Sequence, residues 1–150
     1  MSSDKALLLV LDLRKKDEDK ALEMWTQAQN AVVSFQKQIE QLKQFEQIYI
    51  QEMNVKSNNG VSMTTFMSYQ QFISKLEGIK RRQEAGLVEL EAQEKRAMDN
   101  YLEKQKQRKI IDSLLEKHRN ERLALEAKAE QKLTDDIVSS KQARILMSRK

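Results

Sequence analysis

The chain has 150 residues, of which 39% are hydrophobic, 33% charged and 5% aromatic, with no proline and no cysteine. So little apolar material cannot build a thick globular core, and a narrow seam is expected instead. Without cysteine there is no disulfide framework and no thiolate metal site. The net charge is +4, and the basic residues are interspersed with acidic ones. A nucleic-acid interface, which concentrates basic residues on one face, is therefore not expected.

The first predicted element is a helix from about residue 4 to residue 55. Apolar residues recur there at alternating spacings of three and four, which is typical of a coiled-coil seam. The run from Ala6 to Leu11 resembles a signal segment, but Asp4 and Asp12 flank it, so it is interpreted as buried helix. Nothing approaches the roughly 20 apolar residues that a membrane span requires.

A turn is predicted over residues 56–61, where the sequence is Lys-Ser-Asn-Asn-Gly-Val. The Asn-Gly pair supplies positive φ, and Ser62 or Thr64 can cap the following helix through a side-chain oxygen. The second helix is expected from about residue 62 to residue 147, with a seam of the same period. Absence of proline favours long uninterrupted helices.

The fold class predicted is all-α, with two long helices forming an antiparallel coiled-coil hairpin in a single domain over residues 1–150. The register that aligns both seams places Phe35 opposite Leu87, Trp25 opposite Ala97 and Leu7 opposite Leu115. It also places Arg14 opposite Arg108, a like-charge layer that the pattern does not explain. A second molecule could offer the same seam, but a short turn is cheap to close and favours the hairpin.

From about residue 116 the second helix has no stretch of the first to lie against. This overhang spans about 50 Å if helical, and its thin apolar stripe cannot bury itself, so it is either frayed or bound by a partner. The first helix is apolar around more of its circumference near its start than a seam requires. Together these ends form a candidate docking site, comprising Leu7, Leu8, Val10, Leu11, Leu123, Leu125 and Leu133. The alternative is a locally thickened core and a disordered tail.

The two flanks of the predicted seam differ near the turn. One is polar, and Lys43 and Glu77 can pair there. The other carries two quartets with the offsets i, i+4, i+7 and i+11, which are Gln38, Leu42, Phe45 and Tyr49 on the first helix and Phe72, Leu76, Ile79 and Gln83 on the second. These eight residues, here called the aromatic face, form either a widened core or an exposed docking surface. Gly78 and Gly86 either admit a partner closely or are neutral.

No constellation of catalytic residues is evident. The only histidine, His118, has Glu116 and Glu121 nearby but no second histidine at ligand spacing. There is no glycine-rich phosphate loop, and two helices enclose no pocket. We expect no enzyme activity, no cofactor, no metal and no small-molecule ligand.

The segment Tyr69-Gln70-Gln71-Phe72-Ile73, followed by Leu76-Glu77, resembles the corresponding segment of the FliJ family, small coiled-coil proteins of the bacterial flagellar type III export apparatus. The resemblance implies a stalk similar to the coiled coil of the rotary ATPase γ subunit, with both termini in the hexameric export ATPase. It further implies contact with the membrane export gate, recycling of export chaperones, and a cytoplasmic location at the inner membrane of the flagellar base.

The resemblance also assigns the gate contacts to the eight residues of the aromatic face. This chain has Phe45 where a relative has Tyr, Ile79 where Ala is found, and Gln83 where His is found, so the last position loses a titratable group. ATPase docking carries over only by region, to the terminal leucines and valine named above. Two alternatives are a chaperone-escort or holdase adaptor and a purely structural homodimeric coiled coil.

Overall fold

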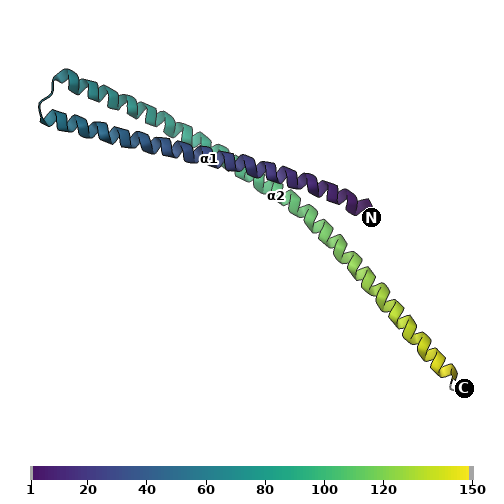
Figure 1. Cartoon of the computed structure of the whole chain (residues 1–150). Helices are drawn as coiled ribbons and strands as arrows, with labels where there is room; N and C mark the ends of the chain where they lie inside the picture. The colour runs from purple at the N-terminus through teal and green to yellow at the C-terminus, as the bar shows by residue number, and fades with distance from the viewer. Residues whose placement is uncertain (1, 149–150) are drawn as a thin grey trace. The chain divides into compact units, whose positions relative to one another are not determined.

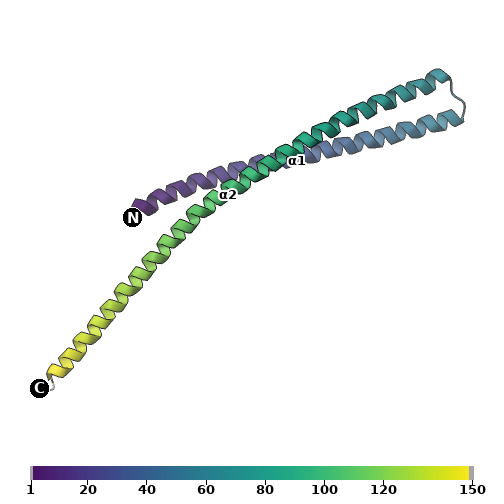
Figure 2. The ribbon, with the colours of Figure 1, turned by 180° about the vertical axis from the view of Figure 1, so that it is seen from behind.

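The computed structural model describes residues 2–148 and contains two helices, α1 (Ser2–Asn58) and α2 (Met63–Ser148), with no strand among these residues. The helices pack against each other as an all-α helical hairpin, which confirms the predicted fold class. Both views show the chain reversing at a short turn, with the two helices side by side next to it (Figures 1 and 2). None of the described helices has a segment apolar enough to cross a membrane.

The turn between α1 and α2 is built by Gly60 and Ser62. Gly60 has a φ of 81°, a left-handed conformation that glycine adopts without a steric penalty. The last turn of α1 closes through the Asn59 amide, which donates to the Val55 carbonyl at 3.2 Å. Ser62 Oγ accepts from the Thr65 amide at 3.2 Å, so Ser62 rather than Thr64 caps α2.

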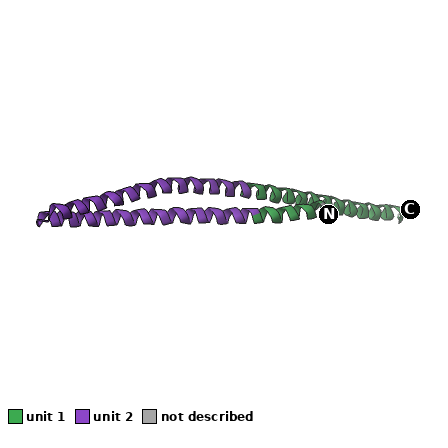
Figure 3. Cartoon of the chain, turned by 90° about the horizontal axis from the view of Figure 1, so that it is seen from above, with its two compact units in different colours: residues 1–16, 105–150 green, residues 17–104 purple. Residues whose placement is uncertain are grey.

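One compact unit comprises residues 17–104 and includes the turn (Figure 3, purple). Its seam is thin, because only Ala21, Val32 and Ile39 are buried there among the described residues. Trp25 contacts Tyr101 with ring centroids 5.5 Å apart, one helical turn from the expected Ala97. The predicted register therefore holds to within one turn.

Gly86 belongs to the packing of this seam. A Cβ atom built on it would lie 3.0 Å from Cε1 of Phe35, next to the Leu87 position predicted opposite that ring. Gly78, in contrast, faces open space. Gly86 thus makes room for the chain's own aromatic ring, which corrects the expectation that it either admits a partner or is neutral.

The other compact unit comprises residues 1–16 and 105–150, of which 2–16 and 105–148 are described (Figure 3, green). Leu11 is buried, while Arg108 Nη1 donates to Asp112 Oδ2 at 2.8 Å. This ion pair along α2 offsets one charge of the Arg14 and Arg108 layer. From Arg119 to Ser148 the helix continues with every residue exposed.

Candidate docking site

The aromatic face is exposed. Phe45 is 55% accessible, Phe72 42% and Ile79 38%. Gln38 is also exposed, while Leu42, Tyr49, Leu76 and Gln83 are half-buried along the seam. Because Phe45, Phe72 and Ile79 remain open to solvent, the structure supports an exposed surface rather than a widened core.

Tyr49 joins the two rows of the aromatic face. Its ring centroid lies 4.6 Å from that of Phe72, at an interplanar angle of 57°, and 6.4 Å from that of Tyr69. Tilted contacts at these distances are favourable between aromatic rings. The aromatic surface is therefore continuous from α1 to α2 within the unit of residues 17–104.

Lys56 lies at the end of these aromatic rings that is nearest the turn. Its Nζ donates to the Tyr69 hydroxyl at 2.6 Å and lies 5.1 Å from the centroid of that ring. The hydrogen bond to Tyr69, with a smaller contribution from Glu52, raises the pKa of Lys56 above its usual value. A cationic group therefore borders the aromatic residues.

An ion-pair cluster centred on Lys80 links the seam to the polar flank. Lys80 Nζ lies 3.1 Å from Glu46 Oε2 and 3.0 Å from Glu77 Oε2, and Arg81 Nε lies 3.5 Å from Glu77 Oε1. The hydrogen bond from Lys80 lowers the pKa of Glu77, and the reciprocal bond raises the pKa of Lys80. The predicted ion pair between Lys43 and Glu77 is wrong, because the Glu77 carboxylate pairs with Lys80 and Arg81 instead.

A second constellation lies in the unit that contains the termini, centred on Asp4. Asp4 Oδ1 is 3.0 Å from His118 Nδ1, and Oδ2 is 3.1 Å from Arg122 Nη1. A carboxylate only accepts hydrogen bonds, so Nδ1 carries the proton. The bond to His118, ahead of the charge of Arg122, lowers the pKa of Asp4. Glu116 and Glu121 are near His118 in sequence, but its observed partner, Asp4, comes from α1 through the pairing of the two helices.

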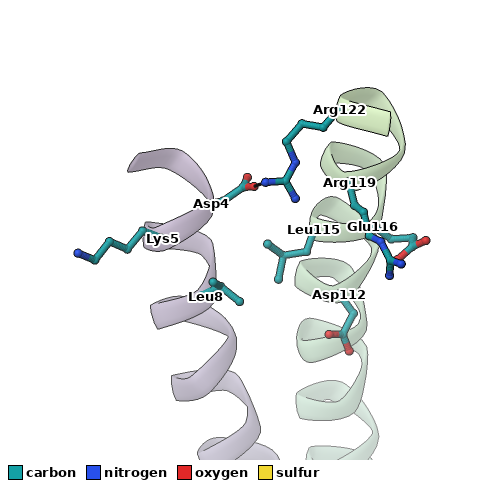
Figure 4. Close-up of a pocket in the computed structure, with 8 residues that line it drawn as sticks. All are labelled: Asp4, Lys5, Leu8, Asp112, Leu115, Glu116, Arg119 and Arg122. Carbon is teal, nitrogen blue, oxygen red and sulfur yellow. Dashed lines mark ion pairs between the residues drawn. The ribbon is translucent and has the colours of Figure 1, made fainter. Parts of the chain in front are cut away.

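A cleft of about 700 Å³ adjoins this constellation. In Figure 4, Leu8 and Leu115 point toward each other from the two helices, and Asp4 reaches across to Arg122. Lys5 points away from α2 in the same view. The two leucines are the apolar part of the cleft's lining, and its other lining residues are charged: Asp4, Lys5, Asp112, Glu116, Arg119 and Arg122.

The terminal residues predicted to dock onto a partner differ in exposure. Leu8, Leu123, Leu125 and Leu133 are exposed, whereas Leu7 and Val10 are half-buried and Leu11 is buried. Leu8 and Leu115 line one cleft together, and Leu125 lines another with Ser3 and Asp4. The described residues contain no group of His, Cys, Asp or Glu that can hold a metal ion.

Fold and site define a two-helix protein with a thin seam and an uncovered aromatic flank. The family model described as flagellar FliJ protein matches residues 3–145, and the chain belongs to this family. The family consists of flagellar export components and is not known as a family of enzymes. The curated proteins and the solved structures compared with the chain gave no match.

Proposed function

We propose that this chain is a stalk-like component of the flagellar export apparatus that binds two partners and catalyses nothing itself. Its termini dock into the hexameric export ATPase and promote assembly and turnover of the ring. Its aromatic face binds the membrane export gate, which holds the protein at the inner membrane on the cytoplasmic side. The observation that carries the proposal is the exposure of Phe45, Phe72 and Ile79 in a member of this family.

The energetics favour a partner for this face. Burying apolar surface stabilises by about 25 cal/mol per Å², and aromatic side chains are the commonest anchors of protein interfaces. No further helix within the described residues covers Phe45, Phe72 or Ile79. A second protein that docks here would therefore bury this apolar surface.

The overhang of α2 supports the ATPase contact by a separate observation. Leu123, Leu125 and Leu133 are 51%, 67% and 62% exposed on a helix whose residues from Arg119 to Ser148 are all open to solvent. An isolated helix gains little stability without a packed face. If both ends of the chain bind more tightly to one state of the ring, docking supplies a coupling free energy that shifts its turnover.

Gate binding is tested by Phe72→Asp, with Val88→Asp as the matched control. Val88 is 67% exposed on the same helix, so both variants place a carboxylate at an exposed apolar position. We expect Phe72→Asp to lose capture of the export gate while ATPase binding is retained, and Val88→Asp to keep both. Equal gate binding by the two variants would refute the role of the face.

ATPase docking is tested by Leu123→Asp with Leu133→Asp. The control is Gln131→Asp with Gln142→Asp, which adds the same charge to the overhang without removing leucines. The leucine variant should leave ring assembly and ATP turnover unstimulated, whereas the control should stimulate both. Unchanged stimulation by the leucine variant would exclude the overhang stripe as the ATPase contact.

The chaperone-escort alternative uses the same exposed aromatic face. It predicts that Phe72→Asp loses binding to export chaperones or unfolded export substrates and keeps binding to the gate. Capture experiments with both classes of partner, run on the same variant, distinguish the two functions.

A further inference from the structure

Basic side chains accompany the apolar residues of the aromatic face on α2. Lys75 follows Phe72 by three residues, and Arg82 follows Ile79 by three. Residues at this spacing are neighbours on a helix surface, and all four side chains are exposed. Two cations therefore border the apolar row at intervals of seven residues.

These cations are available to a partner. Lys75 makes no hydrogen bond or ion pair within residues 2–148. Arg82 Nε makes only a long bond of 3.4 Å to the Gly78 carbonyl, which leaves its other guanidinium N–H groups open to a carboxylate.

Most acidic residues of this stretch of α2 lie on the other flank, while Glu89, seven residues after Arg82, is an exception and lies 3.4 Å from Arg96 Nη2. Glu77, Glu84 and Glu91 recur at intervals of seven on that other flank, and Glu77 binds Lys80 and Arg81. Charge is thus divided between the flanks of α2, with carboxylates on the polar one and uncompensated cations beside the aromatic face.

On α1, Glu52 runs against this pattern, since it follows Phe45 by seven residues. Lys56 lies one turn further along the helix, and Glu52 contributes to the raised pKa of its ammonium group. The carboxylate therefore has a cation of its own, and the excess charge along the face remains positive.

The geometry favours a helix as the occupant. Two antiparallel apolar rows, Phe45 and Tyr49 on α1 and Phe72, Leu76 and Ile79 on α2, lie side by side with no third helix over them among the described residues. An amphipathic helix can cover such an apolar surface with residues at i, i+3, i+4 and i+7. Carboxylates beside its apolar stripe would meet Lys75 and Arg82.

We propose that the segment that binds the aromatic face is an amphipathic helix whose apolar stripe is bordered by Asp and Glu. The inference rests on the proposed function and adds the chemistry of the segment by which the partner is recognised. Phe45, Phe72 and Ile79 supply the buried contact, while Lys75 and Arg82 select the acidic border and speed the encounter.

The first experiment measures association of the purified cytosolic portion of the export gate with Lys75→Glu/Arg82→Glu. The control, Lys95→Glu/Lys109→Glu, makes the same change of charge at exposed positions of α2 outside the face. We expect an association rate about tenfold lower for the first variant alone at low salt, with the difference shrinking as salt rises. Equal rates for the two variants would overturn the proposal.

A second experiment keeps the proposal testable if the gate is not the partner. Two designed peptides of about three heptads carry the same leucine seam, flanked by Glu in one and by Lys in the other. The Glu peptide should bind the wild-type chain about tenfold more tightly, and Lys75→Glu/Arg82→Glu should reverse this preference. No preference, or preference for the Lys peptide, would overturn the inference.

The two experiments separate this inference from the proposed function. A gate that fails to bind, together with a clear preference for the Glu peptide, removes the gate as partner and keeps the acidic helix. A gate that binds through Phe72 but ignores both charge reversals, with no preference between peptides, keeps the function and removes the acidic helix.

Discussion

Gly78 and Gly86 are both interior glycines of α2, and they differ in what surrounds them. Nothing lies within 4 Å of a Cβ built on Gly78, whereas one built on Gly86 meets Phe35 Cε1 at 3.0 Å. Gly78→Ala should therefore raise the free energy of unfolding by about 0.5–1 kcal/mol, the usual helix preference for alanine. Gly86→Ala should gain less or lose stability, because the Phe35 ring must move.

Urea titrations of both variants, followed by circular dichroism, check this pair. We expect Gly78→Ala to have the highest free energy of unfolding, above both the wild type and Gly86→Ala. A Gly86→Ala protein as stable as Gly78→Ala would show that the Phe35 ring yields without cost, and that Gly86 has no packing role.

Asp4 provides a prediction on pH. Its pKa in the folded chain lies below 3.8, first because of the hydrogen bond to His118. The stabilisation from ionised Asp4 is therefore complete above the unfolded value and is lost as pH falls through the lower folded value. Carboxyl NMR titration should show the pKa of Asp4 rising toward 3.8 in His118→Ala. Arg119→Ala is the control, since Arg119 lines the cleft without pairing with Asp4; an equal rise there would contradict the account.

The turn and the helix cap were predictable from the sequence, because they depend on residues that are close together in the chain. Gly60 and Ser62 form the turn and the cap because only their immediate neighbours matter. The partner of His118 comes from the other helix and follows only once the register is fixed, since the register that places Leu7 opposite Leu115 also places Asp4 opposite His118. Glu77 pairs with Lys80 and Arg81, its neighbours at i+3 and i+4 on α2, whereas a pair with Lys43 would have to cross to α1.

At the scale of elements, the helices and their pairing followed from the period of apolar residues and the absence of proline. The seam itself was predicted to within one turn, as Trp25 and Tyr101 show. Periodicity gives each residue its angle around the helix but not the rotamer of a long side chain. The polar contact between Glu46 and Lys80 was therefore missed, although both residues lie in the predicted seams.

The overhang of α2 carries a prediction of its own. Beyond Arg122, which pairs with Asp4, residues 126–148 are helical and each of them is exposed, whereas Ile39 is 6% accessible in the seam of the other unit. A helix without tertiary packing opens readily, so amide hydrogens of the overhang should exchange with solvent much faster than those around Ile39. Hydrogen-exchange mass spectrometry measures this difference. Equal protection in the free protein would mean that the overhang is already packed against something in solution.

At the scale of the whole molecule, the proposed contacts fall in different compact units. The aromatic face lies within residues 17–104, and the terminal leucines and valine lie within residues 1–16 and 105–150. The sequence located the face around the helices but left open whether anything covers it, since periodicity does not reveal what lies above a flank. The exposure of Phe45, Phe72 and Ile79 decides that question.

The most direct test of the account is side-chain footprinting of the chain, free and mixed with the cytosolic portion of the export gate. We expect Phe45, Phe72 and Ile79 to lose their reactivity toward hydroxyl radicals in the complex. Val88 and Leu102, which are 67% and 49% exposed outside the face, should keep theirs. A bound gate that protects Val88 or Leu102 while leaving Phe45, Phe72 and Ile79 reactive would contradict it.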